Sequence, residues 1–164
     1  MKKCFAILTP LFFALVVFSA EGSLAVSVDE KWTLNHRRGD FYSFTRTNDE
    51  SVLLMFSRLP LIGKREKIPV YLDQMAEGFL EKSKKSTGFS LATEEFTKEK
   101  IEGIEFTGEA VVFTIQGGFC QAMFMFGDGN QIWSGQFTGS EEHWAEALKI
   151  LKQLKRNKPE EVIP

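Results

Sequence analysis

The chain has 164 residues, of which 43% are hydrophobic and 26% are charged, and its formal net charge at pH 7 is −2. This length suits a single domain preceded by a short leader, and the chain lacks the basic balance that is typical of nucleic-acid-binding proteins. Because Cys120 is the only cysteine besides Cys4, the domain is expected to be stabilised by packing, without a disulfide.

The first 25 residues have the pattern of a secretory signal peptide. Two lysines precede an apolar run over residues 4–20, and Ser23-Leu24-Ala25 offers the small residues that a signal peptidase requires. The run is shorter than the roughly 20 apolar residues that span a bilayer. We therefore expect cleavage near Ala25 and a periplasmic or secreted protein. The alternative is an uncleaved segment, which would be its only contact with a membrane.

The remainder is predicted to form one domain over residues 26–157, followed by a charged tail at 158–164. Three strands are expected first, at 31–35, 41–47 and 51–59, because aromatic and β-branched runs there are separated by turn signals. The third strand is apolar at nearly every position. This pattern is typical of strands that are covered on both faces, so the sheet is expected to carry a layer on each side.

A helix is predicted next, over residues 70–86. Its apolar residues recur with helical spacing, and charged residues occupy the remaining positions. The apolar stripe consists of Leu72, Met75, Ala76, Phe79 and Leu80.

Four further strands and a second helix complete the domain. The strands are predicted at 89–96, 103–115, 118–126 and 131–139, and the helix at 143–155. The connections between consecutive strands are short, which requires antiparallel pairing. The predicted fold is therefore α+β: a single antiparallel sheet of about six to seven strands, flanked by two helices, in the order βββ-α-ββββ-α.

Ser134 and His143 form the pair that most suggests catalysis. A nucleophile and its base must lie about 2.6–3.2 Å apart, and the rises of a strand and a helix leave a gap of several ångströms between these two residues. Thr138 and Ser140 fit helix N-caps instead, with two glutamates following at the positive end of the helix dipole. We interpret the segment as architectural and the protein as non-enzymatic.

No cofactor or metal site is predicted from the sequence. His36 and His143 are the two histidines of the chain, and neither lies in a zinc-ligand spacing. The motif GDGN at 127–130 is interpreted as a turn, because it lacks the other carboxylates of a calcium loop. Cys120 lies in an apolar strand and is expected to behave as a small apolar residue.

The candidate interaction surface is a basic loop that contains Lys64, Arg65 and Lys67. A stretch rich in glutamate, between residues 94 and 109, carries the opposite charge. Charges on exposed strands also prevent edge-to-edge pairing of sheets. Both patches therefore have a structural interpretation beside the binding one.

The segments IEGIEFTGEA (101–110), FMFGDGNQIWSGQF (124–137) and HWAEALKILKQLK (143–155) carry a family resemblance. In these segments and in its opening strands, the chain resembles the Mog/PsbP/DcrB-like families of small α+β domains, often exported in bacteria. The resemblance implies an antiparallel sheet flanked by helices and an accessory or binding role without catalysis. It carries over no functional residues, because these families share no active-site motif.

Three functions are consistent with these observations. The leading hypothesis is a non-catalytic exported accessory protein that binds an unknown protein partner through its sheet edge or loops. The alternative is a carrier of a small ligand or lipid, with an apolar pocket between sheet and helix lined by residues such as Met123 and Met125. The third is a hydrolase whose site has no recognisable motif.

Overall fold

The computed structural model describes residues 16–18, 24–59, 65–85 and 91–157. Its elements, in chain order, are β1 (Val16–Phe18), β2 (Leu24–Val28), β3 (Trp32–Arg38), β4 (Phe41–Arg46), β5 (Asp49–Arg58), the 3-10 turn η1 (Arg65–Lys67), α1 (Ile68–Lys85), β6 (Leu91–Glu102), β7 (Thr107–Ile115), β8 (Phe119–Gly127), β9 (Ile132–Ser140), α2 (Glu141–Lys152) and β10 (Lys155–Arg156).

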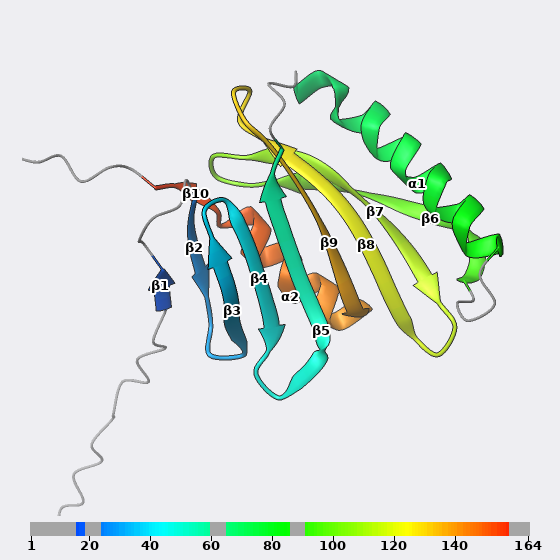
Figure 1. The fold of residues 1–164 in the computed structure, drawn as a ribbon, viewed down its shortest axis with the longest axis horizontal. Helices are drawn as coiled ribbons and strands as arrows, with labels where there is room; N and C mark the ends of the chain where they lie inside the picture. Colours follow the sequence, from blue (N-terminus) through cyan, green and yellow to red (C-terminus); the bar gives the residue numbers. More distant parts are fainter. Residues whose placement is uncertain (1–15, 19–23, 60–64, 86–90, 158–164) are drawn as a thin grey trace, which may run out of the picture.

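A seven-stranded antiparallel sheet forms the centre of the domain (Figure 1). Its strand order is β3-β4-β5-β9-β8-β7-β6, so two meanders meet where β5 pairs with β9. The α+β class, the two helices and the order βββ-α-ββββ-α from β3 to α2 are as predicted. The short turns dictate this arrangement, because a two- to four-residue connection leaves only antiparallel pairing to consecutive strands.

The prediction of a single sheet is wrong. A second, three-stranded sheet has the order β1-β2-β10 and joins the two ends of the described chain. Its central strand, β2, alternates buried and half-buried residues, with Leu24, Val26 and Val28 pointing inward. Ala25, the residue near which cleavage was predicted, lies inside this strand.

The larger hydrophobic core lies between α2 and one face of the main sheet. Trp144, Ala147 and Leu151 of α2 pack there against the phenylalanines of β5, β8 and β9, and the inward side chains of β2 extend the same cluster. A series of ring contacts, including Phe126 with Trp133 at 6.1 Å between centroids, fills this layer. Aromatic side chains contribute large buried apolar areas, so packing can stabilise the domain without a disulfide.

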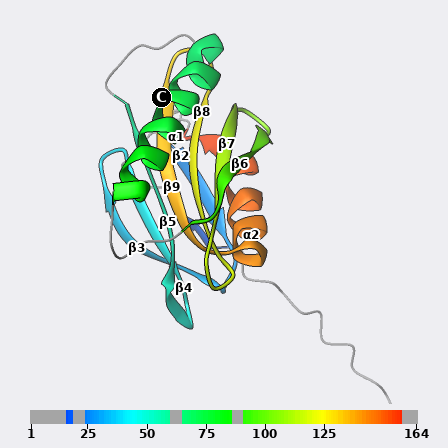
Figure 2. The ribbon, with the colours of Figure 1, turned by 90° about the vertical axis from the view of Figure 1, so that its right-hand side faces the viewer.

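A smaller core lies between α1 and the opposite face of the sheet. Ile68, Leu72 and Ala76 of α1 contact buried residues of β7 and β8, including Phe113 and Met125. The two helices therefore lie on opposite sides of the sheet, with the strands between them (Figure 2). Within the described ranges, no helix combines the length and hydropathy needed to cross a membrane.

Candidate binding surface

The two faces of the main sheet differ in how completely they are covered. On the face that carries α1, the helix lies over β6, β7 and β8 and leaves β4, β5 and β9 beside it (Figure 1). β5 shows the consequence. Its residues Val52, Leu54 and Phe56 are buried towards α2, whereas Leu53 and Met55 point to the other face and are only half-buried.

A hollow of about 220 Å³ opens on this uncovered part of the sheet, next to α1. We call this surface the open groove. It is lined by Phe41, Met55, Phe56, Ser57, Met75, Met123, Ser134, Gly135 and Gln136.

Strand register explains which side chains meet in the open groove. Directly paired residues of antiparallel strands point to the same face. Met55 of β5 pairs with Gln136 of β9, and Gln136 pairs with Met123 of β8. Phe41 and Ser134 both pair with Ser57, which gives a second row across β4, β5 and β9. The lining is thus fixed by the backbone of the sheet.

The orientation of α1 brings a further apolar edge to the open groove. Asp73 of α1 forms an ion pair with Lys98 of β6, so that flank of the helix faces the β6 edge. Successive residues of an α-helix are rotated by about 100° around its axis. Tyr71 and Met75 therefore lie on the flank opposite to Asp73, one turn apart from each other. Met75 lines the groove and is 40% exposed. Phe41, at 36% exposed, lies across the groove on β4.

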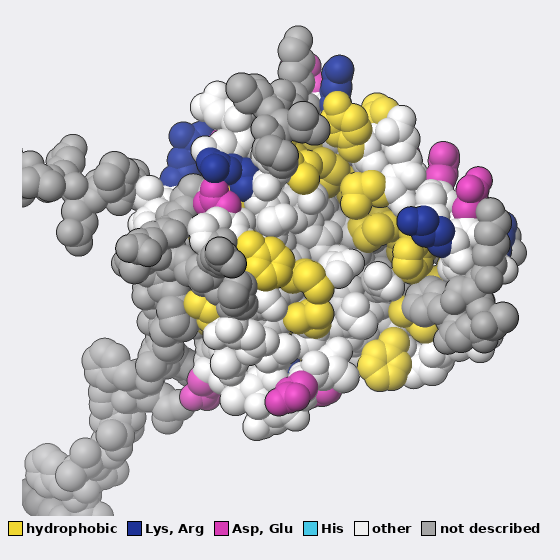
Figure 3. Space-filling model, in the orientation of Figure 1, with side chains coloured by type: hydrophobic (Ala, Val, Ile, Leu, Met, Phe, Trp, Pro, Cys, Tyr) yellow, Lys and Arg dark blue, Asp and Glu magenta, His cyan; other side chains and the backbone are white. Residues whose placement is uncertain are grey.

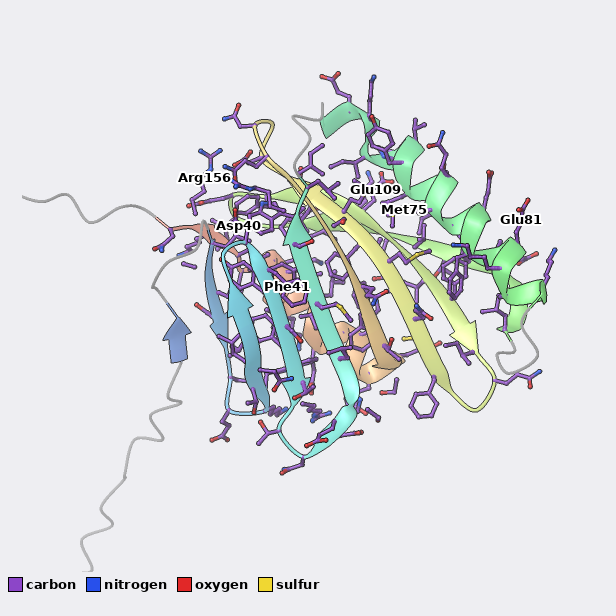
Figure 4. All side chains as sticks on the ribbon, in the orientation of Figure 1. Asp40, Phe41, Met75, Glu81, Glu109 and Arg156 are labelled. Atoms are coloured by element: carbon purple, nitrogen blue, oxygen red, sulfur yellow. The ribbon has the colours of Figure 1, made fainter. Side chains whose placement is uncertain are left out.

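Hydrophobic side chains gather along α1 and over the middle of this face, and the charged side chains lie around its margin (Figure 3). Phe41 and Met75 lie on either side of β5, β9 and β8 (Figure 4). The floor between them is uncharged and mainly apolar, and the amide Nε2 of Gln136 lies 3.5 Å from the thioether Sδ of Met55. Among the described residues, the lining contains two serine hydroxyls but neither histidine nor carboxylate, so these residues offer no base for a nucleophile.

The predicted role of Met75 needs correction. Helical spacing assigned it to the buried stripe, whereas it is exposed because α1 covers only half of the sheet. The expected layer on each side of the sheet is present, but among the described residues it covers one face of β5 incompletely, since Leu53 and Met55 are only half-buried. The sequence signal for this surface is the pattern of β5, which is apolar on both faces. The same pattern also fits a strand that is buried in a complete core, so it does not by itself indicate an uncovered surface.

The pair Ser134 and His143 is divided by the sheet. Ser134 lines the open groove, on the face of α1, whereas His143 belongs to α2 on the opposite face. The capping interpretation is confirmed for Ser140, whose Oγ accepts a hydrogen bond of 3.3 Å from the amide of His143. Glu141 and Glu142 occupy the first turn, where they stabilise the helix dipole.

His143 lines a second hollow, of about 490 Å³, at the start of α2. Thr47 and Asp49 line it as well, so a histidine, an acid and a hydroxyl share one concavity. Two hydrogen bonds from Ser51, one from its hydroxyl and one from its amide, lower the pKa of Asp49. The hydroxyl of Thr47 donates to the carbonyl of Glu30 at 2.9 Å.

The ring of His143 forms no hydrogen bond with these neighbours among the described residues, although its charge contributes to the lowered pKa of Asp49. Its Nδ1 is buried and has no hydrogen-bond partner among the described residues. The cations of this hollow form ion pairs with another residue: Lys31 and Arg46 lie 3.4 and 3.6 Å from the carboxylate of Glu146. Catalysis by a histidine requires hydrogen bonds that join nucleophile, base and orienting acid. The described residues of the second hollow therefore form a network of surface charges, and no hydrogen bond among them joins His143 to Thr47 or Asp49.

The basic loop falls partly outside the described residues, since Lys64 lies there. Arg65 and Lys67 form η1, and the Lys67 side chain is exposed. The glutamate-rich stretch does not form one opposing patch. Glu99 accepts a hydrogen bond from the indole of Trp144, and Glu105 accepts one from the amide of Arg156. At least these two glutamates thus serve the packing of α2 and β10.

The motif at residues 127–130 forms a turn, as predicted. Oδ1 of Asp128 accepts hydrogen bonds from the amides of Asn130 and Gln131, at 2.8 and 2.9 Å, and its other oxygen pairs with Arg156. No group of three or more metal-ligating side chains occurs in the described part of the chain. Cys120 is fully buried, and burial, together with the charges of Glu141 and Glu99, raises its pKa to about 11.

Comparison with known proteins gives structural neighbours only. No family model and no curated protein matches the sequence. The solution structure of cyanobacterial PsbP (CyanoP) from Synechocystis sp. PCC 6803 is similar, with a TM-score of 0.53 and 8% sequence identity over 95% of this chain and 98% of that chain. A crystal structure from Bacteroides thetaiotaomicron VPI-5482 gives a TM-score of 0.44 and 14% identity, over 88% of this chain and 52% of that one.

The likeness to CyanoP extends over nearly the full length of both chains. It shows that this protein has a PsbP-like fold, which the sequence resemblance predicted. At 8% identity the likeness concerns the fold alone.

Proposed function

We propose that this chain is an exported, non-catalytic binding protein that receives a protein partner in the open groove. The observation that carries the proposal is β5, which presents apolar side chains on both faces although α1 covers neither Leu53 nor Met55 completely. Exposed apolar surface of this kind on a folded domain commonly marks an interaction site.

The chemistry of the open groove favours an uncharged, apolar ligand surface. Three methionines, Met55, Met75 and Met123, line it. Their unbranched, polarisable side chains adapt to the shape of a bound segment. Phe41 supplies an aromatic anchor at the margin, of the type that contributes strongly to protein interfaces.

The dimensions of the uncovered surface suit an α-helix of the partner. From β9 to β4, the strands that lie beside α1, there are two strand spacings, which together span about 10 Å. A helix with its side chains is about 10 Å wide, so one amphipathic helix fits beside α1 and completes the second layer. Recognition of this kind places the apolar face of a helix in a groove.

The packing of α1 favours this function over the carrier. Met125 is buried in the core between α1 and the sheet, together with Leu72, Ala76 and Phe113. This interface is filled with side chains, and the hollow of about 220 Å³ beside it is smaller than the 300 Å³ or more of typical ligand pockets. The hydrolase hypothesis lacks a connected set of hydrogen bonds, as described above for His143.

Site-specific photocrosslinking in the exporting cells tests the proposal. A benzophenone amino acid is placed at Gln136, in the open groove, and separately at Ile104, which is 67% exposed in the β6–β7 turn. A crosslinked protein at Gln136 and none at Ile104 supports a groove-bound partner. Equal crosslinking at both positions contradicts it, and so does a lipid or metabolite adduct at Gln136, which would support a carrier.

A further inference from the structure

The methionines of the domain are concentrated on one face. The sequence contains five methionines, including Met1. Met55, Met75 and Met123 line the open groove, and Met125 lies beneath α1 in the smaller core of the same face. All four methionines that the structure describes therefore lie on the α1 face of the main sheet, at or beside the proposed binding surface.

These four thioethers differ in how far solvent reaches them. Met75 is 40% exposed, whereas Met123 and Met125 are 8% and 2% exposed. Met55 is half-buried, and its Sδ accepts a hydrogen bond of 3.5 Å from the amide Nε2 of Gln136. Because an oxidant must reach a lone pair of the sulfur, these environments favour reaction at Met75.

Cys120, the cysteine that the structure describes, is poorly placed to react with an oxidant in solution. Its side chain is fully buried in the larger core. Burial also raises the pKa of its thiol to about 11, so the thiol stays protonated at neutral pH. The thiolate is the form that oxidants attack. Among the described sulfur atoms, that of Met75 is therefore the one that an oxidant meets first.

We propose that Met75 is a site of reversible oxidation by hydroperoxides, and that its oxidation prevents binding of the partner in the open groove. The second half of this inference rests on the proposed function. In the reaction, the terminal oxygen of the hydroperoxide bonds to Sδ of Met75 while the O–O bond breaks. The sulfur is oxidised to the sulfoxide. The departing oxygen takes up the proton of the peroxide hydroxyl and leaves as water or an alcohol.

A sulfoxide at Met75 changes the chemistry of the groove margin. A thioether is apolar and a weak acceptor, whereas the oxygen of a sulfoxide is polar and requires a hydrogen-bond donor. Met75 lies at the exposed margin of the groove on α1 (Figure 4), so water solvates this oxygen in the free domain. An apolar helix that packs on Met75 removes that water, and burial of a polar group without a partner is unfavourable. The oxidised groove therefore rejects the apolar ligand that the reduced groove accepts.

Peptide mapping of peroxide-treated protein tests the assignment of the site. The purified chain is exposed to hydrogen peroxide, and tandem mass spectrometry follows the sulfoxide at each of the four methionines over time. Met75 should oxidise about fivefold faster than Met123, in proportion to their exposed fractions of 40% and 8%. Oxidation of Met123 or Met125 at the rate of Met75 would overturn the inference, and so would earlier oxidation of Cys120.

Photocrosslinking from the groove tests the effect on binding. The benzophenone amino acid is placed at Ser134, which lines the groove and leaves the Gln136 amide on Met55 in place. The chain and its Met75→Leu variant are each treated with peroxide, freed of it, and mixed with the partner isolated by crosslinking at Gln136. Each is compared with its own untreated sample, so any effect of the substitution itself cancels.

We expect peroxide to lower the crosslinking yield about tenfold when Met75 is present, which corresponds to about 1.4 kcal/mol. Methionine sulfoxide reductases should restore this yield, and Met75→Leu should keep its untreated yield. Equal losses in both proteins, or no loss in either, would overturn the inference while the untreated crosslink still supports a groove-bound partner. If no protein is crosslinked before treatment, the proposed function fails, and the peptide map alone decides whether Met75 is the oxidised site.

Discussion

Gly135 shows how a residue without a side chain shapes both faces of the sheet. It pairs with Phe56 on one side and with Phe124 on the other, and these two rings make an edge-to-face contact beneath the open groove. A Cβ at this position would lie 2.3 Å from the carbonyl oxygen of Met55 and 2.5 Å from the ring of Phe124. The close packing of the core, and with it the shape of the groove floor, therefore requires glycine.

We expect Gly135→Ala to destabilise the domain by about 1–3 kcal/mol, the usual cost of overpacking a core. The matched control is Gly78→Ala, because Gly78 lies in α1 and a Cβ added there would meet no atom within 4 Å. Alanine there should stabilise the protein by about 1 kcal/mol or slightly less, owing to its higher helix propensity. Urea denaturation of both variants measures the difference, and equal midpoints for the two would contradict this explanation of Gly135.

The ionisation of Cys120 makes the stability of the domain depend on pH in the alkaline range. Burial raises the pKa of its thiol from the ordinary value of 9.0 to about 11, because the thiolate is poorly solvated in the core, and the charges of Glu141 and Glu99 act in the same direction. The unfolded chain therefore loses this proton first as the pH rises. The contribution of the thiol to stability is complete below pH 9 and is lost as the pH rises through 11.

Denaturant titrations of the natural protein and of Cys120→Ala, at pH values from 8 to 11, measure this contribution. The stability of the natural protein relative to the variant should fall across this range by about 2–3 kcal/mol, the equivalent of a shift of two pKa units. A difference that stays constant from pH 8 to pH 11 would show that the thiol ionises equally in both states.

At the level of elements, the sequence was most informative where one periodicity had a single structural explanation. The stripe Trp144, Ala147 and Leu151, with a serine cap before two glutamates, predicts α2 correctly because packing and capping favour the same segment. The strands of the second meander were predicted for the same reason. Their alternating residues, such as Cys120 and Ala122, all face α2.

The features that the sequence did not predict, such as strand β2 and the exposure of Met75, are those whose pattern fits two explanations. The segment Ser23-Leu24-Ala25 has small residues at the spacing of a cleavage site, but Leu24, Val26 and Val28 also alternate as a strand does. Cleavage signals and strands are both local patterns, and only the buried contact with Tyr42 shows that Leu24 belongs to the core. The exposure of Met75 likewise depends on where α1 lies across the sheet, which helical periodicity does not specify.

At the scale of the whole molecule, coverage of the sheet is asymmetric. One face is closed by α2 and β2, and the other is closed by α1 over β6, β7 and β8 but open over β5 and β9. The candidate surface could not be located from the sequence for this reason: it consists of residues from four strands and a helix that only the strand order brings together. The basic loop with Lys67, which the sequence favoured, lies at the start of α1.

The affinity of the crosslinked partner for groove variants tests the central claim most directly. Met55→Glu introduces a charge into the uncharged groove, and Ile104→Glu introduces the same charge at an exposed apolar residue elsewhere. Isothermal titration calorimetry should show at least a tenfold weaker affinity for Met55→Glu, equivalent to about 1.4 kcal/mol, and an unchanged affinity for Ile104→Glu. Equal affinities for the two variants, with both still folded, would show that the partner does not bind in the open groove.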